Sequence, residues 1–399
     1  MPHKRIVLTD IADDIYLDDF HLQPDAHLTL GGSADWSISK QRMHGGLSDG
    51  VDVVEIDNGL LSLFVLPTRG MGIWRGRYRQ TPFGWNSPVA SPVHPGFVNL
   101  ADRNGLGWLS GFNELICRCG LASNGPPGHD DCGNPVENPL TLHGKIANTP
   151  AHHVEIQISR EGDGLLSITG VVDEAMLFGP RLRLTSRLET AAGSNRFRVV
   201  DTVTNLGGQS VESQLLYHIN IGPPFLDGGA KFVAAVDEVV PRDSRAAEGI
   251  DTWTVYEPPT PGFAEQVYYI VPATDADGWT RVLLENAAAD RGFSLQFRPA
   301  ELPCFSLWKN TQAEADGYCT GLEPATNFPN PRTFERQQNR VRVLARGDSY
   351  QTEFDVTIHD SSESVNATRE AIRAIQGDRK PIIHPRERAG FTPAGADSI

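Results

Sequence analysis

The chain of 399 residues carries 35 Lys and Arg against 50 Asp and Glu, a formal net charge of −15, and 39% of its residues are hydrophobic. This is the composition of a soluble globular protein. The acidic balance argues against nucleic acid or an anionic membrane as a partner, because phosphate-binding surfaces are usually rich in Lys and Arg. We therefore expect a neutral or polyhydroxylated ligand.

The sequence contains no run of about 18 or more apolar residues, and its amino end turns acidic before a signal-peptide core could form. Five cysteines, an odd number in a long chain, do not suggest a disulfide framework. We expect a cytoplasmic protein without a membrane-spanning segment.

Scattered Gly (39) and Pro (28) are typical of turns between many short strands. Period-two alternation is clearest in residues 181–190, where leucines fall on one side and arginines on the other, and in residues 197–205. Further strands are expected, in chain order, at 51–57, 60–66, 153–160, 165–173, 209–221, 230–236, 266–272, 279–286, 293–298, 304–309, 340–346 and 350–359. We predict an all-β fold whose sheets pack against each other to bury their faces.

The chain divides into three parts in this interpretation: residues 1–50 as an amino-terminal extension with the first strands, 51–360 as the main domain, and 361–399 as a helix and tail. Within the main domain, residues 70–150 are rich in proline and lack a period, which predicts long, functional excursions from the sheet. A helix is expected at 363–376, and the basic tail after it is expected to be poorly ordered.

Three short segments concentrate polar residues at expected strand ends. His143 is followed by a glycine, His218 and Asn220 alternate on one face of a strand, and Glu323 stands before a proline. An imidazole and a carboxylate in a dry cleft can act as a general acid and base, because burial and mutual interaction bring their pKa values toward neutrality.

Each of these residues also has an ordinary structural interpretation. A histidine on an alternating strand is more often a structural residue than a catalytic one. Glu323 could equally cap a turn or pair with Arg332 or Arg336. Position alone therefore does not assign a catalytic role.

A family resemblance adds to these signals. The segments Gly321-Leu322-Glu323-Pro324 and Gly347-Asp348-Ser349-Tyr350 resemble the carboxyl-terminal signature of the aldose 1-epimerases, the galactose mutarotase family. The sequence LLYHINIG around His218 resembles the strand that bears the catalytic histidine of that family, and Leu-His-Gly at His143 resembles a segment that contacts the sugar. The resemblance implies a large antiparallel β-supersandwich, with Glu323 and His218 as the catalytic residues.

A closer resemblance is to a branch of mutarotase-like proteins whose substrate is generally unassigned. It rests on Arg-Gly-Met at 69–71, Cys-Gly-Leu at 119–121, the run from His143 to Pro150, and Glu-Gln-Val at 265–267, and it spans roughly residues 50–360. Gly72 stands where the resemblance leads us to expect Asp, and Lys145 where Arg is usual. Both departures bear on the identity of the sugar more than on the reaction.

The resemblance implies a small sugar as substrate, with no metal or cofactor required. Glu323 as carboxylate would remove the proton of the anomeric hydroxyl, and His218 as imidazolium would protonate the ring oxygen, so that the ring opens and recloses on its other face. Residues expected to hold the sugar are Arg69, Trp74, His143, Lys145, Asn220, Glu265 and Gln266.

Other interpretations remain open from the sequence. Related sandwiches host several chemistries, so a noncatalytic carbohydrate-binding protein, a sugar isomerase or a lyase are alternatives. Cys117 and Cys119, with His129 and Cys132 nearby, could form a metal cluster, although their spacing does not match the usual structural zinc pattern.

Overall fold

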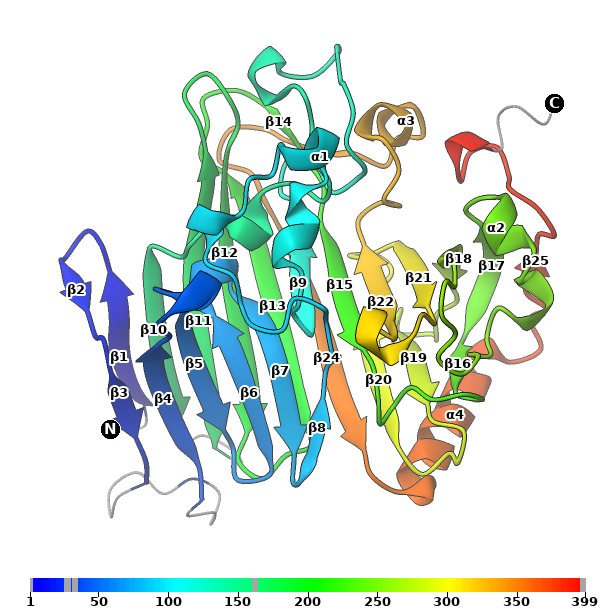
Figure 1. Ribbon diagram of the computed structural model, residues 1–399, viewed down its shortest axis with the longest axis horizontal. Helices are drawn as coiled ribbons and strands as arrows, with labels where there is room; N and C mark the ends of the chain where they lie inside the picture. Colours follow the sequence, from blue (N-terminus) through cyan, green and yellow to red (C-terminus); the bar gives the residue numbers. More distant parts are fainter. Residues whose placement is uncertain (1–2, 25–29, 31–34, 160–163, 395–399) are drawn as a thin grey trace.

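The computed structural model describes residues 3–24, 30, 35–159 and 164–394. Two large β-sheets, of ten and thirteen strands, form a sandwich (Figure 1). Strand pairs in the described residues are antiparallel except for β17 with β25. The predicted all-β sandwich is confirmed.

The ten-stranded sheet has the order β16-β19-β20-β24-β13-β12-β11-β10-β1-β2. Its strands in chain order are β1 (His3–Asp10), β2 (Ile15–Tyr16), β10 (His153–Ser159), β11 (Leu165–Ala175), β12 (Arg181–Ala191), β13 (Arg196–Asn205), β16 (Lys231–Ala234), β19 (Thr280–Glu285), β20 (Gly292–Phe297) and β24 (Ser349–His359).

The thirteen-stranded sheet has the order β25-β17-β18-β21-β22-β15-β9-β7-β6-β5-β4-β3, with β8 paired to β7. Its strands are β3 (Phe20–Leu22), β4 (Ser37–Arg42), β5 (Asp52–Asp57), β6 (Leu61–Leu66), β7 (Gly72–Tyr78), β8 (Thr81–Phe83), β9 (Ile116–Cys119), β15 (Leu216–Ile221), β17 (Val236–Pro241), β18 (Gln266–Pro272), β21 (Cys304–Asn310), β22 (Cys319–Ala325) and β25 (Ile382–Ile383).

The remaining elements are short, apart from one helix. Besides several short 3-10 helices, they are the strand pair β14 (Val211–Ser213) and β23 (Arg342–Leu344), and the helices α1 (Asp102–Gly105), α2 (Ser244–Ala247), α3 (Arg332–Gln337) and α4 (Ser362–Gln376). The helix α4 packs against β19 and β16 at one end of the sandwich (Figure 1). No helix among the described residues is long and apolar enough to cross a bilayer.

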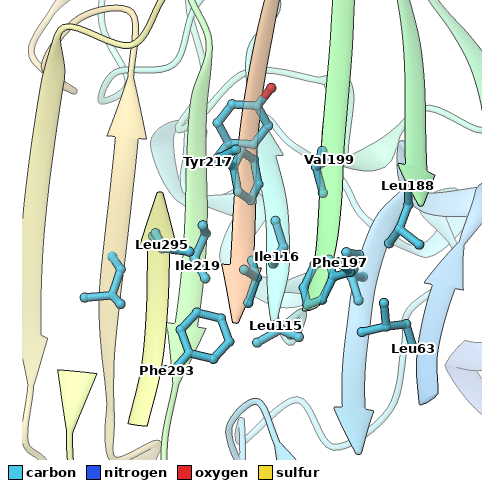
Figure 2. Close-up of a cluster of buried hydrophobic side chains, with 14 of the residues drawn as sticks. Leu63, Leu115, Ile116, Leu188, Phe197, Val199, Tyr217, Ile219, Phe293 and Leu295 are labelled. Carbon is cyan, nitrogen blue, oxygen red and sulfur yellow. The ribbon is translucent and has the colours of Figure 1, made fainter. Parts of the chain in front are cut away.

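The core lies between the two sheets. Figure 2 shows Phe197 of β13 and Phe293 of β20 facing Ile116, Tyr217 and Ile219 from the opposite sheet. Because side chains alternate along a strand, the residues between these point outward. In β15 and β9 this places His218, Cys117 and Cys119 on the outer face of the thirteen-stranded sheet, where a second apolar cluster lies.

Most expected strands are found within a residue or two of their predicted bounds, and the predicted helix is α4. Three expectations were wrong in part. Residues 209–221 form two strands in different sheets, β14 and β15. Residues 70–150 include β7 and the central strand β9. The tail, in its described part, is packed: β25 pairs with β17, and Thr392 is buried.

Candidate active site

His218 and Glu323 meet on the outer face of the thirteen-stranded sheet. Their strands, β15 and β22, are neighbours, with Ile219 opposite Leu322. His218 Nε2 lies 3.2 Å from Glu323 Oε1, and the two residues are only 5% and 3% exposed. A Cβ at Gly321 would stand 2.5 Å from Glu323 Oε1, so the glycine leaves room for the carboxyl group. The sequence therefore brings together an imidazole and a carboxyl group that lie far apart in the chain.

The hydrogen bonds of Asn220 fix the tautomer of His218. The Asn220 Nδ2 donates to the carbonyl oxygens of Glu114 (2.9 Å) and His218 (3.1 Å), which leaves its Oδ1 to accept from His218 Nδ1 at 2.6 Å. His218 Nδ1 therefore carries a proton. A single proton shared between His218 Nε2 and Glu323 Oε1 would join the two groups by one hydrogen bond.

Burial decides where the shared proton rests. Burial raises the pKa of Glu323 to about 8, against the opposing charge of His143, and burial lowers the pKa of His218 to about 3. Both shifts disfavour a charged group in a dry site. The favoured form near neutral pH is a protonated Glu323 beside a neutral His218.

His143 forms a second, charged pair with Cys119. The ring of His143 lies edge-on to Trp108, with centroids 4.7 Å apart, and its Nδ1 donates to the Asn124 carbonyl at 2.8 Å. Burial opposes the charge of both members. Their mutual interaction nevertheless raises the pKa of His143 to about 9 and, with a hydrogen bond from Cys117, lowers that of Cys119 to about 6. The interaction favours a proton on His143 over one on Cys119, and the His143 ring lies 5.6 Å from the His218 ring between centroids.

Aromatic rings surround the His218–Glu323 pair. Phe112 and Trp308 stand edge-on to His218, at centroid distances of 4.9 and 5.2 Å, and the Trp108 ring lies tilted against Phe112, with centroids 4.5 Å apart. Trp308 Nε1 donates to Glu265 Oε2 at 2.6 Å. Such rings offer flat apolar walls with a few polar atoms at their edges, which suits a ligand that has both an apolar face and hydroxyl groups.

Arg69 lies in the interior, and four of its five N–H groups donate to protein atoms. It is 1% exposed, and its Nε pairs with Glu114 at 2.6 Å. Its other nitrogens donate to the carbonyls of Val93 and Gly111 and to the Asn148 side chain. The geometry corresponds to a residue that supports the strand beneath the site.

The other expected sugar-binding residues fall into two groups. His143 and Glu265 lie near the His218–Glu323 pair, and Asn220 lies beneath His218. Trp74 packs instead with Val51, Val53 and Leu66. Lys145 is exposed, with its Nζ 3.9 Å from Met176 Sδ. Gln266 points inward, because it pairs in register with the inward-facing Lys309.

Gly144, directly after His143, is required by the local backbone. It has φ +71°, and a Cβ there would stand 2.3 Å from the carbonyl oxygens of both Gly120 and Ser123. We expect Gly144→Ala to lower the free energy of unfolding by at least about 2 kcal/mol, measured by urea denaturation. Gly128→Ala is the matched control, because a Cβ at Gly128 meets no atom within 4 Å. Equal stabilities of the two variants would contradict this account.

The cysteines of the metal alternative are separated in the structure. Cys117 and Cys119 are buried, whereas Cys132 is exposed. Among the described residues, no group of three or more His, Cys, Asp or Glu is arranged to hold a metal ion.

Comparison with known proteins places this geometry in context. A structure of a candidate aldose 1-epimerase from Klebsiella pneumoniae is 36% identical, covers 97% of this chain and 98% of its own, and superposes with a TM-score of 0.91. A galactose mutarotase-like protein from Clostridium acetobutylicum (15% identity, 82% and 100% coverage, TM-score 0.55) and a candidate aldose 1-epimerase from Escherichia coli K12 (14%, 78% and 99%, 0.50) share the fold. No curated protein matches the chain.

The fold and these relatives define a galactose mutarotase-like protein, as the sequence resemblance predicted. Within that class, residues 48–358 match the family described as a domain of unknown function, DUF4432, and the chain belongs to it.

Sequence reasoning did not assign roles to three residues of the site. Trp108 and Phe112 lie in the range 70–150, where the sequence predicted excursions from the sheet, and Trp308 lies in the predicted strand 304–309. Strand alternation gives one signal for Trp308. Ser306 pairs with Glu323 across the sheet, and Trp308 lies two positions after Ser306. Trp308 therefore lies on the same face of the sheet as the carboxyl group of Glu323. Trp108 lies in a short 3-10 helix, Gly107–Gly111, and Phe112 follows it directly; an element this short has no period that predicts the direction of its side chains.

Proposed function

We propose that this protein is a sugar mutarotase that interconverts the anomers of an aldose by acid–base ring opening at Glu323 and His218. The observation that carries the proposal is the direct contact of these two groups, 3.2 Å apart, among aromatic side chains on the outer face of the sheet. The family-level likeness to aldose 1-epimerase relatives supports the same reaction class.

The shared proton is what the reaction needs. When the anomeric hydroxyl and the ring oxygen of a sugar replace the direct contact, one member of the pair accepts the hydroxyl proton while the other protonates the ring oxygen. The C1–O bond of the ring breaks, the C1–C2 bond rotates, and the reverse transfers close the ring. No net proton is gained or lost.

The two members can perform the steps in either direction. In the neutral form that burial favours, His218 Nε2 is the base and the Glu323 carboxyl group is the acid. In the charge-separated form, the roles are those expected from the sequence, with Glu323 as base and His218 as acid. Both forms hold one proton, so the proposal requires the pair to be singly protonated.

The charged His143 is placed to orient the sugar. Its ring lies beside His218, and the interaction with Cys119 raises its pKa to about 9. Its Nδ1 donates to the Asn124 carbonyl, which leaves Nε2 as the nitrogen that can donate to a sugar hydroxyl.

Polarimetry of freshly dissolved single anomers tests the proposal. A panel of aldoses, including galactose, glucose, a deoxy sugar and a uronic acid, should contain at least one whose approach to anomeric equilibrium the protein accelerates. Acceleration of none of them, together with measurable binding of one, would favour a noncatalytic carbohydrate-binding protein instead.

The pH dependence follows from the single proton. Because burial raises the pKa of Glu323 to about 8, the pair loses its last proton as the pH rises above that value, and no acid remains. We expect the catalysed rate constant to fall by about tenfold for each pH unit above about 8, after subtraction of the buffer-catalysed rate. A rate constant that stays level or rises up to pH ~10 would contradict the shared-proton account.

A further inference from the structure

A second polar cluster lies on the other face of the strands that carry the site. Trp308 of β21 points outward to His218, whereas the next residue, Lys309, points inward. There it lines a cavity of about 600 Å³ that is open to solvent and is bordered by the loop 257–264 and helix α2. This Lys309 cavity shares no lining residue with the His218–Glu323 pair.

Lys309 differs from the other buried cations of the chain. Among the described residues, five Lys or Arg residues are buried. Four of them have a carboxylate within 4 Å: Lys40 with Asp52, Arg69 with Glu114, Arg118 with Asp201, and Arg332 with Asp130. Lys309, in contrast, donates only to the carbonyls of Val255 (2.7 Å) and Thr252 (3.4 Å).

An ammonium group has three N–H donors, and the two carbonyls use only two of them. Burial lowers the pKa of Lys309 to about 8, although the charge of Glu257 opposes this shift and the Tyr256 ring lies 5.1 Å from the ammonium group. A buried cation without a carboxylate in contact is stabilised by an anion bound in the adjoining cavity.

Unpartnered hydroxyl groups lie in the same place. Thr311 lines the cavity, is 1% exposed, and its Oγ1 has no hydrogen-bond partner. Tyr268 Oη is also buried without a partner, next to the cavity-lining Gly249 and Gln266. A buried hydroxyl is rarely left unpaired, so these groups indicate an absent polar partner.

We propose that the Lys309 cavity binds a small, hydroxylated organic carboxylate, whose oxygens accept from Lys309 Nζ and Thr311 Oγ1. Glu248 and Glu257 line the same cavity. They repel a dianion more than a monoanion, which favours a carboxylate over a phosphate. The polar walls, with Thr252, Thr260 and Gln266, suit a ligand with hydroxyl groups.

Isothermal titration calorimetry tests the proposal. The ligands are sodium gluconate, sodium acetate and inorganic phosphate, each compared with sodium chloride at the same ionic strength. We expect saturable gluconate binding at millimolar concentrations, with acetate and phosphate weaker. Lys309→Met and Thr311→Val should each lower the affinity for gluconate by about tenfold or more, because each removes a hydrogen bond to a charged group.

Two variants serve as controls. Lys231→Met removes an exposed lysine, and Glu323→Gln alters the outer face; both should bind gluconate as the wild type does. Lys309→Met also removes two hydrogen bonds to backbone carbonyls, so its melting temperature is measured beside that of the wild type to confirm that the fold is kept. Thr311→Val provides an independent test of the same site.

Several results would overturn the proposal: no gluconate binding, binding unchanged in Lys309→Met or Thr311→Val, tighter binding of phosphate, or loss of binding in Glu323→Gln. The last result would place the carboxylate at the outer face. None of these outcomes depends on whether the protein is a mutarotase.

Discussion

Glu323→Gln and His218→Asn should each lower the rate of protein-catalysed anomer interconversion by about a hundred- to ten-thousandfold, the range that general acid–base catalysis contributes. Each variant breaks the exchange of a proton between Glu323 Oε1 and His218 Nε2. The amide of Gln cannot donate and accept protons in turn, and Asn has no group that titrates. Initial rates from polarimetry, at equal concentrations of folded protein, measure the effect.

Sugar binding should survive both substitutions, because the surrounding aromatic walls are unchanged. Glu363→Gln, on the exposed side of α4, is the matched control and should keep the wild-type rate. If Glu323→Gln retains the wild-type rate, the proposed acid–base pair is wrong. If either variant loses binding and rate together, the pair has a binding role instead of a catalytic one.

Arg69→Met should lower the free energy of unfolding by about 3–5 kcal/mol, because it leaves the carboxylate of Glu114 buried without its cation. Glu114 is completely buried, and its carbonyl oxygen accepts from Asn220, which orients His218. Urea denaturation followed by tryptophan fluorescence measures the loss.

The double variant Arg69→Met/Glu114→Gln should recover part of that stability, because no uncompensated charge remains. The account of Arg69 as a supporting residue also predicts that folded Arg69→Met protein still binds sugar. Full stability combined with loss of sugar binding would instead support the substrate contact expected from the sequence.

Alternation predicted much of the sandwich. In β12 and β13 buried and less buried residues alternate, and most of the buried ones are apolar, so the period is visible although Ser186 and Asp201 also point inward. The strand β9 gave no such signal: its sequence is Ile-Cys-Arg-Cys, all four residues are buried, and the inward Arg118 is paired with Asp201. A short strand buried on both faces carries no hydrophobic period.

Of the candidate site, the sequence predicted the central pair of residues but not the side chains around it. The resemblance to the mutarotases named Glu323 and His218, and the sheet does bring them together. It also grouped Glu265 and Gln266 as ligands, although adjacent residues at the start of a strand face opposite ways. The pairing of His143 with Cys119 could not be predicted, because it depends on how a loop with left-handed backbone at His143 folds onto β9.

The most direct test of the central claim is exchange spectroscopy by nuclear magnetic resonance on an aldose at anomeric equilibrium, with substoichiometric protein. The wild type should produce magnetisation transfer between the α and β anomeric protons, and Glu323→Gln and His218→Asn should abolish it. A sugar that saturates the wild-type protein while its anomers exchange no faster than in buffer would contradict the claim.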